Sequence, residues 1–398
     1  MLEARERLGG RIWTSQRWAD APLDLGATWI HGAQGNPLSV IARSISAAML
    51  QTRYDRSVTY GPTALVMSSK QEDHLDSLAD AFARALHKAQ KRDVDQSVRA
   101  VADAWSISAR LSRQDQNLLR FILLGRYETE YAGDASALSA HWYDDARAFP
   151  GEDALFVKGF GVLAEYLARD LRIERNQVVR NVNWNNRGVQ VQTDRGEFSA
   201  DAAIVTLPLG VLKAGVVHFS PALPAAKSRA IQALGMGVLN KCYLRFEKAF
   251  WPDDVDWLEH VPPAGLGWTQ WVSFVRVAGL PVLLGFNAGQ QGRDMEALSD
   301  AAIVASAMQT LRTIYGAQIP EPLDAQITRW GSDPFALGAY SFNALGAQPA
   351  MRDDLAAPVG GRVFFAGEAT MRRDFSSAHG AFLSGQRAAN QVTQAYSR

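Results

Sequence analysis

The fold is decided most strongly by F-F-A-G-E-A-T at residues 364–370, which is followed by S-S-A-H-G-A at residues 376–381. An apolar strand, a Gly-Glu turn and a helix that begins with small residues leave open backbone N–H groups at the helix N-terminus. Such groups can receive a phosphate or an electron-rich ring edge. A purely structural interpretation stays open, because Ser376 and Ser377 suit a helix N-cap equally well.

Further strand signals precede this block. Residues 189–193 alternate apolar and polar side chains, and residues 202–207 form an apolar run typical of a buried strand. The runs 242–246 and 282–286 predict strands of a second sheet.

Helical patterns lie between the strand signals. Residues 36–147 are predicted to be mostly helical, since Gly and Pro are scarce from 68 to 124 and apolar residues within 73–92 recur at spacings of three, four and four. Residues 295–315 predict another helix. The stripe within 73–92 consists of Leu75, Leu78, Phe82 and Leu86.

Sheet signals near both termini, separated by helices and a second sheet, predict an α/β protein with a discontinuous nucleotide-binding domain. The expected segments are 1–40, 151–215 and 346–398 for that domain, 41–150 for a mostly helical insertion, and 216–345 for a substrate-binding sheet with helices.

Composition excludes several classes of protein. The chain of 398 residues has 41 Lys+Arg against 41 Asp+Glu, so its net charge of zero gives no electrostatic reason to expect nucleic acid binding. The single Cys242 excludes an internal disulfide and a cysteine-based metal site, and no metal site is predicted. We see no apolar window long enough for a membrane span and no signal peptide, so a cytoplasmic location is expected.

The N-terminal motif is L-E-A-R followed by L-G-G-R at residues 8–11. In a dinucleotide-binding βαβ unit, the acid that ends the second strand accepts hydrogen bonds from ribose hydroxyls, and Glu3 fits this role. Gly9 and Gly10 would let the backbone approach a pyrophosphate, and Arg11 offers paired donors to phosphate oxygens. An ordinary solvated turn is the alternative.

Two further motifs contain side chains suited to chemistry. In D-L-G-A-T-W-I-H-G at residues 24–32, small residues allow backbone to approach a flat cofactor, and His31 could enter a cavity where it handles protons. The alternative is a core or surface histidine in a loop. Lys241, at the start of a strand, is costly to bury unless it is paired or lies in a wet cavity, and a surface lysine is the alternative.

These blocks together resemble the flavin-containing amine oxidases, a family that includes monoamine, polyamine and spermine oxidases and the flavin histone lysine demethylases. The resemblance covers essentially the whole chain. Its polyamine and spermine oxidases are most similar, because residues 26–32 are followed by Gly35-Asn36-Pro37. It implies an FAD-binding Rossmann-like domain of the GR2 type and an α+β substrate-binding domain with a helical insertion. The ordered blocks are L-E-A-R…G-G-R, L-G-A-T-W-I-H-G, V-T-L-P-L-G-V-L at 205–212, N-K at 240–241 and F-F-A-G-E-A-T…H-G-A.

The resemblance also implies which residues bind FAD. The cofactor is expected to be non-covalent, because residues 369–371 read Ala-Thr-Met where covalent relatives carry a cysteine. The matching positions are Glu3 for the ribose, Arg5, Gly10 and Arg11 for the phosphates and ribityl chain, Gly26, Ala27 and Thr28 beneath the isoalloxazine, Val178 for the adenine, Gly367 and Glu368 at the ribityl end, and Ala378 near the ring.

Four residues match positions that take part in amine oxidation. Lys241 matches the lysine that holds a water near flavin N5, and His31 matches an active-site histidine of polyamine and spermine oxidases. Tyr340 matches one wall of the aromatic amine cage. Ser377 stands where monoamine oxidases place a second cage aromatic, which favours a longer and more open amine channel.

The implied partners are a small-molecule amine and O2. The implied reaction is hydride transfer from a polyamine-like amine to flavin N5, hydrolysis of the imine to an aldehyde and an amine, and reduction of O2 to hydrogen peroxide. Glu128, Glu130 and Asp134 are candidates to receive a polyamine's distal charges, and solvated helix ends are an equally good interpretation. The alternatives are a related flavin oxidase of L-amino acids or monoamines, and a non-catalytic homologue. The sequence predicts no oligomeric state.

The start of the chain differs from the family pattern. The family opens with a strand, a G-x-G-x-x-G loop and a helix before the acid, which here is Glu3. A unit of roughly 30 residues is therefore expected to be missing, and FAD binding to be impaired. A fragment, a late-starting reading frame and a decayed gene are three explanations that the sequence leaves open.

Overall fold

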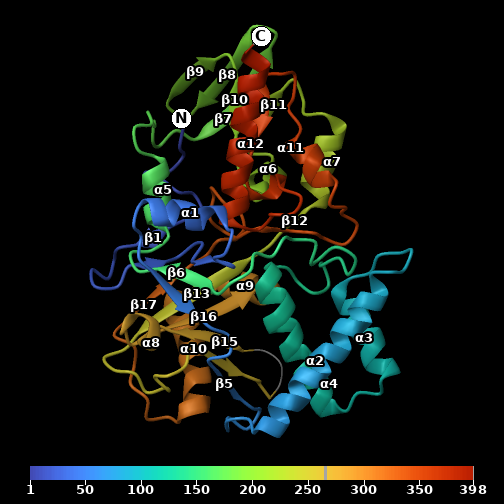
Figure 1. The fold of residues 1–398 in the computed structure, drawn as a ribbon, viewed down its shortest axis with the longest axis vertical. Coiled ribbons are helices and arrows are strands. Elements are labelled where there is room, and N and C mark those ends of the chain that lie inside the picture. The colour runs from blue at the N-terminus through green and yellow to red at the C-terminus, as the bar shows by residue number, and fades with distance from the viewer. Residues whose placement is uncertain (264–266, 398) are drawn as a thin grey trace.

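The structure is a computed structural model that describes residues 1–263 and 267–397. Along its long axis the molecule has two parts, and both termini lie in the upper one (Figure 1). The long C-terminal helix α12 (Ala378–Tyr396) belongs to the upper part, and a large sheet belongs to the lower. The predicted α/β class is confirmed.

The upper part is assembled from segments that are far apart in the sequence. β10 (Ala203–Val205) pairs in parallel with β19 (Val363–Phe365), and Leu2 forms a parallel bridge with Glu174. Both ends of the chain thus meet a middle segment, as expected of a discontinuous domain (Figure 1). The exact residue boundaries of its segments stay predictions.

A four-stranded sheet in the order β11-β7-β8-β9 packs on the β10–β19 pair through a shared apolar cluster. Its strands are β7 (Val179–Asn185), β8 (Gly188–Thr193), β9 (Gly196–Ala200) and β11 (His218–Ser220). The helices of the upper part are α1 (Pro37–Ser44), α5 (Gly161–Leu167), α6 (Leu209–Ala214), α7 (Ala225–Ala233), α11 (Met351–Ala356), α12 and the short η2 (Glu368–Thr370).

β10 is shorter and less buried than the sequence predicts. The apolar run 202–207 predicts a fully buried strand, but the strand covers only residues 203–205 and Ile204 is 41% exposed. Ile204 lies opposite Phe364 in the register. Phe364 is buried in an apolar cluster with residues of α12, whereas Ile204 is not part of that cluster. The prediction of a wholly buried strand is therefore wrong at Ile204.

The lower part is built on a six-stranded sheet in the order β17-β13-β16-β15-β14-β5. β13 (Leu239–Arg245) and β16 (Val282–Ala288) are neighbouring interior strands of this sheet, and every residue of β16 is buried. Successive residues of β13 enter different apolar clusters, because alternate side chains point to opposite faces. Both strands confirm the predictions. The others are β5 (Ser57–Tyr60), β14 (Trp257–His260), β15 (Gln270–Ser273) and β17 (Asp324–Ile327).

The helical pattern at 295–315 is two helices rather than one. α9 (Gly289–Glu296) ends within it, and α10 (Asp300–Tyr315) begins after Ser299. The Ser299 side chain accepts a hydrogen bond from the N–H of Ala302, which makes it an N-cap and starts a new helix there. The short α8 (Val275–Ala278) completes the helices beside the sheet.

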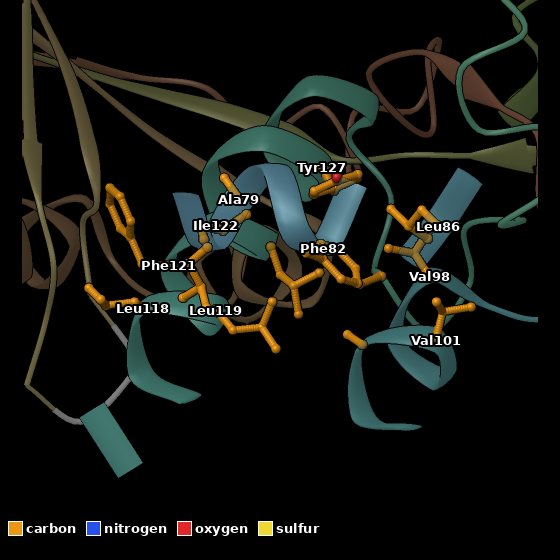
Figure 2. Close-up of a cluster of buried hydrophobic side chains, with 14 of the residues drawn as sticks. Ala79, Phe82, Leu86, Val98, Val101, Leu118, Leu119, Phe121, Ile122 and Tyr127 are labelled. Carbon is orange, nitrogen blue, oxygen red and sulfur yellow. The ribbon is translucent and has the colours of Figure 1, made fainter. Parts of the chain in front are cut away.

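The helical insertion forms its own core, shown in Figure 2. α2 (Ser69–Ala89), α3 (Val98–Ser108) and α4 (Arg113–Leu123) pack together, and the π-helix η1 (Leu124–Thr129) continues α4. All four residues of the predicted stripe are buried in this core, which confirms it. No described helix is long and apolar enough to cross a membrane.

A small sheet joins the two parts of the molecule. It consists of β3 (Trp29–Ile30), β6 (Asp153–Phe156) and β4 (Met49–Thr52). One face packs against the large sheet through Trp29 and Leu155, and the other packs against α1 and α5 through Ile30 and Phe156. The remaining strands are β1 (Thr14–Ser15), β2 (Leu23–Asp24), β12 (Gly235–Met236) and β18 (Ser341–Phe342).

Candidate active site

One buried lysine holds the segment from Asp24 to Thr28. Lys241 in β13 is 5% exposed, and its Nζ donates hydrogen bonds to the backbone oxygens of Asp24 and Gly26, each at 2.7 Å. The Thr28 hydroxyl is its third partner. These contacts occupy all three donors of an ammonium group, which offsets the cost of burying it. The surface-lysine interpretation is wrong.

Lys241 also titrates together with Asp24. Burial lowers the pKa of Lys241, and the Asp24 carboxylate opposes that effect. Burial raises the pKa of Asp24, against the hydrogen bond from Thr14 and the charge of Lys241. Two buried groups that interact in this way share their titration steps.

The Asp24 carboxylate ties the same segment to the upper part. It accepts hydrogen bonds from the Thr14 hydroxyl at 2.5 Å and from the N–H of Phe160 at 2.8 Å, and Thr14 accepts one from the N–H of Gly161. Two N–H groups at the start of α5 are thereby satisfied. The sequence alone did not single out Asp24 for this role.

Gly26 is required by a close approach of backbone to backbone. The N–H of Ala27 donates to the Arg11 carbonyl at 3.1 Å, and a Cβ on Gly26 would lie 1.8 Å from that same oxygen. Only glycine fits between the two segments. The structure thus brings together the predicted residues Arg11, Gly26 and Ala27.

Arg11 and Glu368 form a second junction. Arg11 Nη1 lies 2.9 Å from a carboxylate oxygen of Glu368, which is 4% exposed. Glu368 also accepts hydrogen bonds from the Ser341 hydroxyl at 2.6 Å and the N–H of Ser376 at 2.8 Å. Burial raises the pKa of Glu368, but the charge of Arg11 and the Ser341 hydrogen bond outweigh burial and leave the pKa below its usual value.

The surroundings of this junction fit a dinucleotide such as FAD. Gly10 (φ +59°) and Gly367 (φ +121°) both have a backbone conformation suited to glycine, and a Cβ at either would meet no atom within 4 Å. Backbone therefore borders open space on both sides of the Arg11–Glu368 pair. Arg7, which the sequence analysis did not identify, donates from Nη1 to the Gly10 carbonyl at 2.8 Å. Its buried Nη2 has no acceptor among the described residues, so a donor remains for a phosphate.

The segments that contain Glu3 and Val178, which are expected to bind the adenosine end of FAD, lie side by side. The N–H of Gln177 donates to the Glu3 carbonyl at 2.8 Å, which places Val178 beside Glu3. One carboxylate oxygen of Glu3 accepts the N–H of Arg5. The Arg5 guanidinium itself lies 2.5 Å from Asp333 and over the Phe335 ring, so the protein already pairs the charge that was expected to contact phosphate or ribityl oxygens.

The start of α12 places Ser377 and Ala378. Ser377 is an N-cap: its hydroxyl accepts the N–H of Gly380 at 3.0 Å and donates to the Asp374 carbonyl at 2.8 Å. Ala378 is the first residue of the helix and packs against the apolar cluster around Phe160. The N-cap interpretation of Ser377 is confirmed, and its expected place in the amine cage stays a prediction.

We call the region around His31, Tyr340 and Glu130 the amine side, after the role that the resemblance implies for it. The Tyr340 hydroxyl donates to the carbonyls of Thr129 and Glu130 at 3.0 and 3.1 Å, which places the tyrosine at the end of η1. Burial is the main cause that raises the pKa of Tyr340, and Asp153 is the main cause that raises the pKa of His31. The charge of Glu130 adds a smaller increase to both pKa values, so the three side chains lie within electrostatic range. Glu130 is exposed and has no hydrogen-bonded partner for its carboxylate among the described residues.

The other two acidic candidates have structural partners. Glu128 is buried, accepts the N–H of Ala135 at 2.9 Å and lies 3.7 Å from Arg99. Asp134 pairs with Arg293 and accepts the N–H of Gln290 at the start of α9. Of the three predicted acids, Glu130 alone lacks a hydrogen-bonded partner for its carboxylate among the described residues.

Tyr54 is a site residue that the sequence analysis missed. Its ring stacks on Trp257 at 4.7 Å, and its side chain is 59% exposed. The surrounding protein raises the pKa of its hydroxyl, and the charges of Glu130, Asp153 and Glu259 raise it further. Tyr54 therefore lies within electrostatic range of three carboxylates. Tyr54 lies in a turn without periodicity, so no sequence signal marked it.

The nucleotide-binding part supplies one wall of the site, and the large sheet supplies a buried lysine. This is the arrangement of a flavin-dependent oxidase. The sequence profile of the family described as flavin containing amine oxidoreductase matches residues 1–393. The chain belongs to this family and is an FAD-dependent amine oxidase.

Known relatives and structures agree with this assignment. Polyamine oxidase 2 of Arabidopsis thaliana is 35% identical over 405 residues, which span 98% of this chain and 82% of the relative. A lysine-specific histone demethylase 1 homolog 3 of Oryza sativa subsp. japonica is 36% identical over 414 residues, 99% of this chain and 51% of that protein. The solved structure of putrescine oxidase bound to putrescine has the same fold, with a TM-score of 0.78, 21% identity, and coverage of 99% and 93% of the two chains.

The contacts of Lys241 predict two separable effects of Lys241→Met. The variant removes three hydrogen bonds to the 24–28 segment, which we expect to cost about 1–3 kcal/mol of stability. If Lys241 also serves the oxygen reaction, the reduced protein regains its flavin absorbance at least about a hundredfold more slowly on exposure to O2. Stopped-flow absorbance measures this rate.

Lys227→Met is the matched control. Lys227 is also buried, burial lowers its pKa to about 7, and its Nζ donates to the carbonyls of Asp354 and Leu355. This variant should lose stability without a change in the oxygen reaction. Normal oxygen kinetics in Lys241→Met would remove Lys241 from that step.

Proposed function

We propose that this enzyme oxidises a polyamine-like amine, with release of an aldehyde, a shorter amine and hydrogen peroxide. When bound, FAD supplies the redox chemistry, accepting a hydride from the amine and passing the electrons to O2. The observation that carries the proposal is the carboxylate of Glu130, which has no partner among the described residues and lies within electrostatic range of His31 and Tyr340. A cytoplasmic location and non-covalent FAD are part of the same proposal.

The charge of the site suits a substrate with several ammonium groups. Glu130, Asp153 and Glu259 act on Tyr54 together, so negative charge extends along one side of the site. Carboxylates attract a polycation and favour the charged form of its distal amines. Tyr54 and Tyr340 add ring faces on which the alkyl segments of such a substrate can pack.

The amine that reacts must be uncharged, because a protonated nitrogen has no lone pair to stabilise the developing iminium. Aromatic walls disfavour the ammonium form there. In this proposal His31 orients the nitrogen or removes its proton. The segment 24–28, fixed by Lys241, forms the surface on which the flavin ring is expected to lie.

The names of the relatives support polyamines without excluding another amine. Plant proteins named polyamine oxidase and histone demethylase homologues are similar to this chain at nearly equal identity. A peptide with a methylated lysine is therefore the second substrate class to test, beside L-amino acids and monoamines.

A peroxide-coupled assay of the FAD-loaded protein tests the proposal. We expect turnover of spermine or spermidine, weaker turnover of putrescine, and little with benzylamine, L-amino acids or a dimethyl-lysine histone peptide. Activity confined to the peptide, a monoamine or an amino acid would contradict the polyamine assignment. A protein that does not hold FAD would support the non-catalytic alternative.

Glu130→Gln tests the residue that carries the proposal. We expect the KM for spermidine to rise roughly ten- to a hundredfold, since a hydrogen bond to a charged group contributes about 1.5–3 kcal/mol. The KM for a monoamine should hardly change, because a monoamine has no distal charge.

Glu165→Gln, which neutralises an exposed acid on α5, is the control for net charge. Steady-state kinetics of Glu130→Gln and Glu165→Gln with spermidine and with a monoamine measure these KM values. An equal rise in KM for spermidine and for the monoamine would show that Glu130 does not bind the distal ammonium group.

A further inference from the structure

His31 and Asp153 meet because of the register of the small sheet. β3 and β6 pair with Trp29 opposite Leu155 and Ile30 opposite Ala154, so the next pair in the register is His31 opposite Asp153. Side chains of opposite residues lie on the same face of a sheet. This face carries Trp29 and Leu155, which pack against the large sheet, so the His31–Asp153 pair lies on the face turned toward that sheet.

The contact between the two residues has defined geometry. Nδ1 of His31 lies 2.8 Å from one carboxylate oxygen of Asp153, and the other oxygen accepts the N–H of Gly32 at 2.9 Å. A carboxylate only accepts, so Nδ1 must be the protonated nitrogen of a neutral ring. Nε2 has no hydrogen-bond partner among the described residues, and the His31 side chain is 59% exposed.

Three titratable groups face His31, each from a different element. Asp153 lies in β6, Glu130 follows η1, and His379 lies in α12. The surrounding protein lowers the pKa of His31 by desolvating the ring. The hydrogen bond and the charge of Asp153 outweigh this effect and raise the pKa, and Glu130 raises it by a smaller amount. Burial lowers the pKa of His379 to about 4, so that ring is neutral and adds no charge near pH 7.

We propose that Asp153 is a positioning residue for His31, which holds the Nδ1–H and so leaves the Nε2 lone pair for the proton that the amine must lose. This inference rests on the proposed function. In the step, the N–H bond of a substrate ammonium breaks, its electron pair stays on the amine nitrogen, and an Nε2–H bond forms. The resulting imidazolium lies against the Asp153 carboxylate, and its proton leaves to solvent because the ring is exposed.

Asp153→Asn separates this role from a structural one. An asparagine side-chain oxygen can still accept the N–H of Gly32, but its amide would present N–H to Nδ1 and favour the wrong tautomer. We expect the pKa of His31 to fall by at least about one pH unit with loss of the negative charge. We also expect kcat/KM for spermidine to fall at least about tenfold.

Two measurements on the FAD-loaded protein test the inference. Histidine-selective ¹⁵N NMR, with the His31 signal assigned from His31→Gln, follows the tautomer and pKa directly. The pH profile of kcat/KM rises as His31 loses its proton, so in Asp153→Asn the rising limb should move to lower pH while the plateau drops.

A matched control exists in the helical insertion. His74 Nε2 lies 2.7 Å from Asp115, far from the site, and Asp115→Asn should leave both the His31 signal and the pH profile unchanged. The inference would be overturned if His31 in Asp153→Asn kept the pKa and tautomer of the wild-type protein. It would also be overturned if the pH profile of kcat/KM and its plateau were those of the wild-type protein. If no amine is oxidised, the proposed function fails, and the NMR titration still decides the role of Asp153.

Discussion

The structure depends most on the burial of Lys241 against the segment from Asp24 to Thr28. A lysine inside a protein is costly unless its donors are satisfied, and this one is satisfied wholly by a segment distant in sequence. The same segment is held from the other side, because the Asp24 carboxylate bonds to the start of α5. The two parts of the molecule therefore share one strip of backbone, and the site lies along it.

This constraint explains why the site has two distinct sides. The upper part supplies glycine backbone, the Arg11–Glu368 pair and the start of α12, which suit a dinucleotide. The lower part and the helical insertion supply aromatic rings and carboxylates, which suit a cationic amine. The small sheet β3-β6-β4 connects the two sides and presents His31 with Asp153 where they meet.

Features that repeat over a short stretch of sequence were predictable. The α2 stripe, the interior strands β13 and β16, and the strand–turn–helix at the C-terminus all follow from local periodicity and turn chemistry. Contacts between distant residues were not predictable. Arg11 and Glu368 are 357 positions apart and His31 and Asp153 are 122 apart, and no spacing rule relates such pairs. Likewise, composition could not show that Asp333 pairs with Arg5, or that Glu128 and Asp134 have partners within the fold.

The central claim is that these two sides place a polyamine against bound FAD. It is tested most directly by mixing the FAD-loaded protein with spermidine in the absence of oxygen and following the flavin absorbance. The account predicts that the yellow absorbance is lost in a single turnover and that an equal ionic strength of sodium chloride has no effect. A protein that holds FAD and stays fully oxidised with spermidine, spermine and putrescine would contradict it.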